Sequence, residues 1–265
     1  MPAAIKLQKE FGDDIQVIFV ESQNSGYGKS MGMAAKSGWL GTEAIWTNKY
    51  LFSTGGGGLP SFALLDGEGK VVLKGSSNSL HGAIVGEVER MVKAKGDAPE
   101  GVPSKVAKVY GDIQKGNYAK AKVNAGKVLA KPGSKDTDMV VAAAEAVLAE
   151  IDKQFDAEMH RAEWLLQNGY PLEAKDKVDL LAKGVKGDVD MSAMVADFKA
   201  ALAGEQYKED FAAAKALAKL ENALYEDGGS DKLIKKLNEV ADDYAGSPVA
   251  KRAKGLVEVA KYSNM

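Results

Sequence analysis

The sequence contains no cysteine, and this absence excludes several kinds of chemistry at once. Disulfide bonds, thiolate-bound metals and cysteine nucleophiles all require that residue. The absence by itself indicates no particular compartment. Histidine is scarce as well, because His81 and His160 are the only two, and neither has a second ligand at a metal-binding spacing. The sequence therefore implies no metal and no cofactor.

An excess of charge of either sign is also missing. The 265 residues carry 35 Lys and Arg against 37 Asp and Glu, a net charge of -2. The balance is 10 against 11 up to Gly101 and 25 against 26 beyond it. A protein that binds nucleic acid or an anionic membrane surface usually has a basic region, so we expect no nucleic-acid partner.

Long apolar runs are absent too. No run approaches the roughly 20 residues that a membrane-spanning helix needs, so no membrane span is predicted. Near the N-terminus Ile5, Leu7 and Phe11 alternate with charged residues, which is not the pattern of a secretory signal peptide.

Two glycine-containing stretches fail as nucleotide-binding motifs. Gly28-Lys29-Ser30 would need a glycine at position 23 to wrap phosphate groups, and that position holds Gln23. The glycines at 55–58 precede a proline and a strand, whereas a dinucleotide fingerprint precedes a helix. We therefore expect these glycines to give the chain conformational freedom ahead of Pro60.

The most informative stretch runs from Gly55 to Leu73. Phe62–Leu65 is a short apolar run typical of a buried strand, and Val71–Leu73 is a second run of strand-forming residues. Asp66–Gly69 between them is a turn signal. Pro60 stands just before the first strand, where its missing N–H costs no ladder hydrogen bond. The stretch predicts a loop, a proline and a β-hairpin.

Helices and strands alternate around this hairpin. Ile15–Glu21 is almost continuously apolar and predicts a strand covered on both faces. Ser79 is a candidate cap for the helix that follows the hairpin. The predicted helices are 2–11, 29–36 and 80–95, and 44–47 is either a brief strand or a turn of helix. Gly96–Pro103 is rich in glycine and proline and predicts a domain linker.

Everything beyond the linker has helical periodicity. The predicted helices are 105–114, 118–130, a long stretch around 141–155, 158–167, 172–182, 191–203, 207–225, 231–244 and 248–262. Gly116-Asn117-Tyr118 and Gly169-Tyr170-Pro171 both place a glycine turn and a tyrosine ahead of an alanine that would pack at a helix crossing. Ser247 and Pro248 are placed to cap and begin the last helix. This pattern resembles tetratricopeptide-like helical hairpins, but the two turns lie 53 residues apart rather than about 34. It predicts a degenerate helical array.

The order helix, strand, helix, proline, hairpin, helix over residues 1–95 resembles the thioredoxin fold, in its exported thiol-disulfide oxidoreductase type. In that type Cys-x-x-Cys is followed by Met-Pro-Ala and an amphipathic helix, and this chain begins Met1-Pro2-Ala3. We therefore expect an α/β thioredoxin-like domain at 1–101 without its first part, followed by an all-α helical-hairpin domain at 102–265. Met1 is then an internal methionine of a longer protein or a truncated start; the alternative is a cysteine-free variant that begins here.

The resemblance implies a binding site but no catalytic residue. Leu59, Pro60 and Ser61 match the cis-proline loop that binds substrate backbone in the family, and we predict a cis Leu59–Pro60 bond. Trp39 and Trp46 either line the groove beside this loop or pack against the sheet. Exchange requires thiolate attack on a disulfide, so the chain as written is expected to be redox-inactive.

Two functions follow as hypotheses. The first is a thioredoxin-domain relative of thiol-disulfide oxidoreductases, exported by resemblance. The alternative is a non-catalytic interaction module that binds a protein or peptide partner through the helical array and the cis-proline groove. The family's central strand would lie between Ile15–Glu21 and Phe62–Leu65. Because nothing in this chain supplies it, we also expect an open sheet edge and self-association through it.

Overall fold

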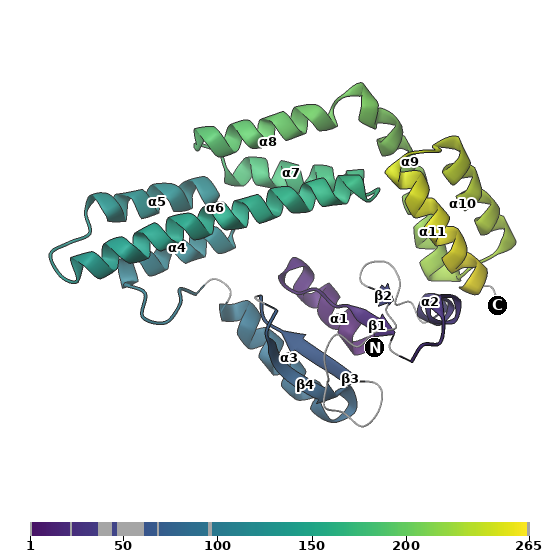
Figure 1. Ribbon diagram of the computed structural model, residues 1–265, viewed down its shortest axis with the longest axis horizontal. Coiled ribbons are helices and arrows are strands. Elements are labelled where there is room, and N and C mark those ends of the chain that lie inside the picture. The colour runs from purple at the N-terminus through teal and green to yellow at the C-terminus, as the bar shows by residue number, and fades with distance from the viewer. Residues whose placement is uncertain are drawn as a thin grey trace. The chain divides into compact units, whose positions relative to one another are not determined.

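The computed structural model describes residues 2–21, 23–36, 44–46, 61–67, 69–94 and 97–263. They form two compact units, and most of them are helical (Figure 1). The N-terminal unit consists of the described residues of Met1–Lys95 together with Leu224–Gly229 and Val259–Met265. The second, the helical unit, consists of those of Gly96–Ala223 and Ser230–Glu258.

The N-terminal unit has two small sheets among its described residues. Its elements are α1 (Pro2–Phe11), a short 3-10 turn (Gly12–Asp14), β1 (Phe19–Glu21), α2 (Tyr27–Lys36), β2 (Ala44–Trp46), β3 (Ser61–Leu65), β4 (Val71–Ser76) and α3 (Ser77–Ala94). β1 pairs in parallel with β2, and β3 pairs antiparallel with β4. The predicted helix at 2–11 and the predicted hairpin are confirmed, and the segment at 44–46 is a strand.

The β3–β4 hairpin is closed by the predicted turn. The Asp66 N–H donates to the Lys70 carbonyl oxygen over 2.9 Å, and the Lys70 N–H donates to the Asp66 carboxylate over 2.9 Å. Gly69 has φ +81°, a conformation that glycine adopts without a steric penalty. Figure 1 shows α3 alongside this hairpin, and the helix contacts both strands.

The prediction of a doubly covered strand at Ile15–Glu21 is wrong. Only Phe19–Glu21 belongs to a ladder, and Ile18 is 48% and Val20 42% exposed. Between Ile15 and Val17 the backbone is hydrogen-bonded to the side chain of Gln8 instead of to a strand. The Gln8 amide donates to the Ile15 carbonyl oxygen over 2.9 Å and accepts from the Val17 N–H over 2.6 Å. Because these groups are bonded to Gln8, they are not available to a neighbouring strand.

The predicted cap of α3 is also wrong. The helix already begins at Ser77, so Ser79 lies inside its first turn rather than ahead of it. The four residues from Ser76 to Ser79 are all good capping types, and the sequence alone could not choose among them.

The helical unit contains an array of antiparallel helices. Its elements are α4 (Ser104–Gln114), α5 (Tyr118–Ala130), α6 (Thr137–Gln167), α7 (Pro171–Gly184), α8 (Val189–Leu202), α9 (Glu205–Asp227), α10 (Asp231–Asp243) and α11 (Pro248–Ser263), the ends of α9 and α11 belonging to the N-terminal unit. The predicted cap of α11 is confirmed, because the Ala250 N–H donates to Ser247 Oγ over 3.0 Å.

The two helices predicted at 141–155 and 158–167 are one. α6 runs without a break over 31 residues, because neither glycine nor proline interrupts the sequence between Thr137 and Gln167. Its buried face continues through the predicted boundary, with Ile151, Phe155, Met159 and Ala162 all buried.

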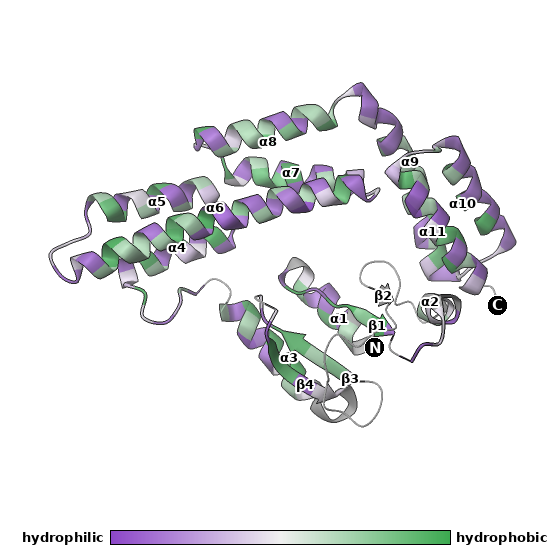
Figure 2. Ribbon diagram, viewed as in Figure 1, coloured by the Kyte–Doolittle hydropathy of each residue, from purple (hydrophilic) through white to green (hydrophobic). Residues whose placement is uncertain are grey.

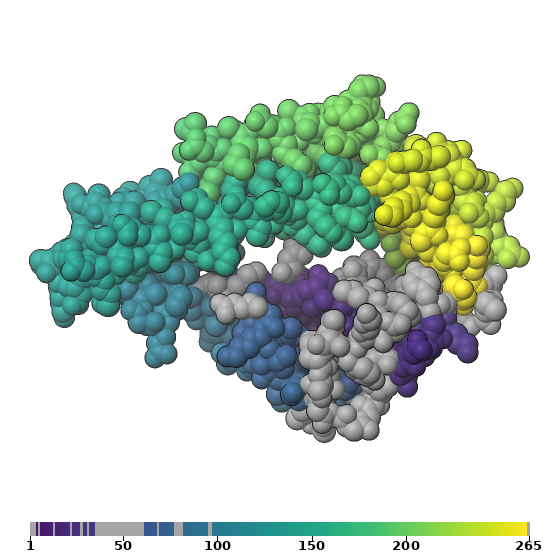
Figure 3. Space-filling view, viewed as in Figure 1, coloured from purple at the N-terminus to yellow at the C-terminus, as the bar shows by residue number. Residues whose placement is uncertain are grey.

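The five helices from α4 through α8 share one hydrophobic core. Each helix contacts the next, and α4 also contacts α6 and α5 contacts α7, as expected when helical hairpins stack. Phe155 and Ile151 of α6 are among its largest fully buried side chains. Figure 2 shows hydrophobic and hydrophilic stretches alternating along these helices, and Figure 3 shows their atoms packed side by side.

The two predicted glycine turns connect the hairpins of this array. Gly116 joins α4 to α5 with φ +67°, and Gly169 joins α6 to α7 with φ +83°. The alanine five residues after each, Ala121 and Ala174, has no exposed surface. The sequence pattern therefore identified both helix crossings correctly.

Candidate functional site

The residues predicted for the cis-proline site are only partly described. Leu59, Pro60 and Trp39 lie outside the described residues, so the cis peptide bond stays a prediction. Ser61 is the first residue of β3, and Trp46 is the last residue of β2. These two residues belong to different sheets among the described strands.

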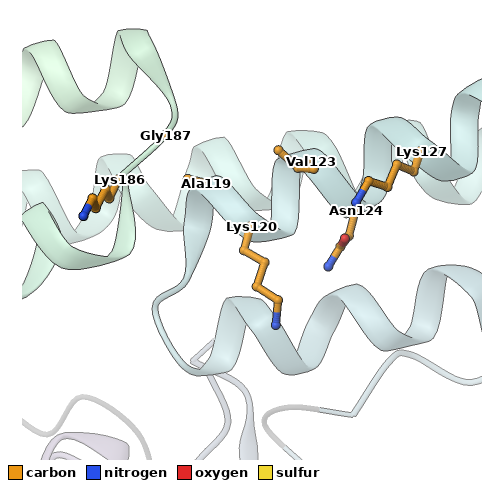
Figure 4. Close-up of a pocket in the computed structure, with 7 residues that line it drawn as sticks. All are labelled: Ala119, Lys120, Val123, Asn124, Lys127, Lys186 and Gly187. Atoms are coloured by element: carbon orange, nitrogen blue, oxygen red, sulfur yellow. The ribbon is translucent and has the colours of Figure 1, made fainter.

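A groove in the helical unit is the better described candidate. It has a volume of about 320 Å³ and lies between α5 and the turn that joins α7 to α8 (Figure 4). Val123 of α5 supplies apolar surface and is 52% exposed. The groove is lined by Ala119, Lys120, Val123, Asn124, Lys127, Lys186 and Gly187. We call it the α5 groove.

A buried carboxylate fixes the α4 side of this groove. Asp112 of α4 accepts from Lys120 Nζ over 2.7 Å and from the Asn124 amide over 2.8 Å. Burial raises the pKa of Asp112, but these two hydrogen bonds and the charges of Lys120 and Lys115 outweigh burial, so its pKa lies below the usual range. The ionised Asp112 therefore holds two groove residues in place.

A lysine fixes the opposite wall. Lys122 of α5 places its Nζ 3.2 Å from the Asp152 carboxylate and 3.4 Å from that of Asp188. Burial lowers the pKa of Lys122, but its hydrogen bonds and charge interactions with both carboxylates outweigh burial and raise it. Asp188 also caps α8, because its carboxylate accepts from the Met191 N–H over 2.9 Å. The turn carrying Lys186 is thereby tied to α5 and α6.

The end of α7 lies very close to the backbone of the turn between α4 and α5. A Cβ on Gly184, the last residue of α7, would lie 1.9 Å from the Gly116 carbonyl oxygen. Only glycine allows this contact. Tyr118 packs beside it, edge-to-face with Phe155 at 5.9 Å. Burial, with the charge of Glu158, raises the pKa of Tyr118 to about 12, so its hydroxyl is neutral at physiological pH.

The groove offers cationic groups that the protein itself does not neutralise. Lys127 and Lys186 are exposed and form no ion pair within the described part of the chain. Lys120 keeps 65% of its side chain exposed while it binds Asp112. Since an ammonium has three donors, it can bind a further acceptor. The arrangement can bind carboxylates beside an apolar contact.

A second hollow lies where α11 begins, lined by Gln167, Gly246, Ser247, Pro248, Ala250, Lys251 and Lys254. Next to it Arg252 donates to the Gly169 carbonyl oxygen over 3.2 Å and pairs with Glu221. Its guanidinium lies 3.8 Å from the centre of the Tyr170 ring, and Tyr170 stacks on Trp164 at 6.2 Å. Both Arg252 and Glu221 are largely buried, so we interpret this cluster as a clamp between the α6–α7 turn and α11.

The described residues contain no group of three His, Cys, Asp or Glu placed to hold a metal ion. No helix within the described ranges has the length and apolar character to cross a membrane. The chain matches no protein-family model, no curated protein and no solved structure.

Sequence reasoning did not predict the α5 groove. Its lysines belong to α5 and to a turn 59 residues further along the chain. The one available signal was the polar spacing of Lys120 and Asn124, which places both on one face of a helix. That signal is common to most solvent-exposed helices and singles out no site.

Proposed function

We propose that this protein is a non-catalytic interaction module whose helical array binds a protein or peptide partner. The observation that carries the proposal is the α5 groove, which combines exposed apolar surface with unpaired cations on a rigid support. Leu180, Val189 and Met194 add exposed apolar side chains on α7 and α8. Exposed apolar residues among polar ones are typical of protein-binding surfaces. We also propose that the array is tetratricopeptide-like, which agrees with an interaction role.

Disulfide exchange is the less favoured function for this chain. The reaction needs a thiolate, and the sequence has no cysteine to supply one. A binding role needs only surface complementarity and a support that stays in place. The core of α4–α8 and the clamps around Asp112 and Lys122 provide that support.

Peptide selection tests the interaction function. The full chain is immobilised and presented with a random dodecapeptide library on phage, with a surface lacking the protein as control. We expect enrichment of peptides that bind the chain in solution with micromolar affinity. If no peptide is enriched over the control surface, the interaction function is wrong.

We also propose that the N-terminal unit is a thioredoxin-like domain. The order of α1, β1, α2, the β3–β4 hairpin and α3 supports it. The pairing among described strands supports it as well, because β1 bonds to β2 and β3 to β4, and no ladder joins β1 to β3. A cis Leu59–Pro60 bond in an experimental structure is the expected result, and a trans bond would contradict the assignment.

Self-association through the sheet edge is part of the same proposal. β3 has one ladder partner, β4, among the described strands, and we propose that its other edge forms the pairing. Light scattering after size-exclusion chromatography should then give a mass above that of the 28.0 kDa monomer, rising with concentration. A monomer at all concentrations would refute the proposal.

A further inference from the structure

We propose that the α5 groove binds an acidic segment of a partner protein, in an extended conformation, with an apolar side chain of that segment placed over Val123. This inference rests on the proposed interaction function and specifies its site and the chemistry of its partner. Charge is the first reason. Of the cations lining the groove, Lys127 and Lys186 have no acidic partner among the described residues. The ammonium group of Lys120 has further N–H donors besides the one that binds Asp112.

The acidic groups nearest the groove do not cancel this charge. Asp112 is occupied by Lys120 and Asn124, and Asp188 by Lys122 and the N–H of Met191. Both carboxylates are largely buried by the contacts they make. The charge that remains for a ligand is therefore positive, and an anionic segment complements it.

The positions of the lysines favour a segment with several carboxylates over one compact anion. Figure 4 shows Lys120, Lys127 and Lys186 pointing in different directions rather than toward a common point. Lys120 and Lys127 are seven residues apart on α5, which corresponds to about 10 Å along the helix axis. An extended peptide advances about 3.3 Å per residue and its side chains alternate between two faces. Carboxylates two or four positions apart therefore share a face, and their separations of about 7 and 13 Å bracket the distance between the two lysines.

Val123 sets the second requirement. It lies between the two lysines on α5 and is half exposed although it is apolar, and Ala119 continues the apolar surface toward the turn. An apolar side chain placed there would remove this surface from water. A single-stranded nucleic acid would also suit the lysines, but the residues lining the groove include no aromatic side chain on which a base could stack.

The groove is also preorganised. Lys120 and Asn124 are held by Asp112, and the turn carrying Lys186 is held by Lys122 through Asp188. A site whose walls are already fixed loses less conformational freedom when its ligand binds. This makes a short peptide a sufficient probe.

The experiment compares two double variants of the full chain. Lys127→Gln with Lys186→Gln removes the two unpaired cations of the groove. Lys215→Gln with Lys236→Gln makes the same charge change at exposed lysines of α9 and α10 that form no ion pair among the described residues. Peptides enriched from the dodecapeptide library are synthesised with a fluorescein label, and their Kd is measured by fluorescence polarisation. A fluorescein-labelled dT20 oligonucleotide is titrated in parallel.

The inference predicts that enriched peptides contain several Asp or Glu and at least one large apolar residue. The groove variant should weaken their binding about tenfold, the effect of two exposed ion pairs, while the control variant leaves Kd unchanged. Enriched peptides without acidic residues, or equal Kd values for the two variants, would overturn the inference and leave the interaction function standing. A dT20 complex that the groove variant abolishes would overturn it in favour of nucleic acid. If no peptide is enriched, the interaction function and this inference fail together.

Discussion

Replacing Gly184 by alanine tests how the α5 groove is assembled. Alanine normally stabilises a helix over glycine by about 0.5–1 kcal/mol. At this position the new Cβ would lie 1.9 Å from the Gly116 carbonyl oxygen, whereas carbon contacts are relaxed at roughly 3.5–4.0 Å. The obstacle is backbone, so the α4–α5 turn and the end of α7 must separate by more than an ångström. Overpacking of this kind costs about 1–3 kcal/mol, so we expect Gly184→Ala to destabilise the chain by about 1–2 kcal/mol.

Gly126→Ala is the matched control, because a Cβ on this glycine of α5 meets nothing within 4 Å. We expect it to stabilise the chain by up to about 1 kcal/mol. Urea unfolding followed by circular dichroism at 222 nm measures both changes. If the free energy of unfolding falls by about 2 kcal/mol per molar urea, the unfolding midpoint of Gly184→Ala should lie roughly 0.5–1 M below that of the wild type. Equal stabilisation by the two substitutions would refute the close approach.

Three further results are expected. Arg252→Ala should cost roughly 3 kcal/mol in a urea melt, because it leaves a largely buried Glu221 without its guanidinium, and adding Glu221→Gln should recover part of the loss. The pKa of Asp112 is lowered in the folded state, so its contribution to stability is present above the unfolded value near pH 3.9 and disappears as the pH falls further. Wild type and Asp112→Asn should therefore differ in urea midpoint at pH 7 and converge toward pH 2, and a gap that stays constant would contradict this. The chain should not accelerate insulin reduction by dithiothreitol.

The helices of the array could be predicted from the sequence because each buries a periodic apolar face. The turns at Gly116 and Gly169 were also identifiable from local sequence. In each, a glycine that forms the turn is followed by a tyrosine and by a small alanine that packs where two helices cross. The boundary predicted within α6 was wrong, because no glycine or proline near it ends the helix. In the structure the apolar stripe continues from Phe155 to Met159 and Ala162 at spacings of four and three residues.

Strands and the candidate site depend on contacts between distant residues. The extended backbone at Ile15–Val17 is bonded to Gln8, and no periodicity in the strand itself reveals that competitor. The α5 groove likewise lies beside contacts between residues far apart in the sequence, Lys122 with Asp188 and Gly184 with Gly116. Each lysine of the groove has the sequence context of an ordinary solvated side chain. The local pattern therefore gives the helices, whereas the groove requires their packing.

The absence of native cysteine allows a direct measurement of where a partner binds. A single cysteine is introduced by Val123→Cys in the α5 groove or by Ser61→Cys at the start of β3, beside the predicted cis-proline loop. The rate of alkylation by N-ethylmaleimide is then measured with and without a saturating library-selected peptide. We predict several-fold slower alkylation of the Val123→Cys chain and an unchanged rate for Ser61→Cys. Protection of Ser61→Cys with no effect at Val123→Cys would contradict the account and move the site to the N-terminal unit.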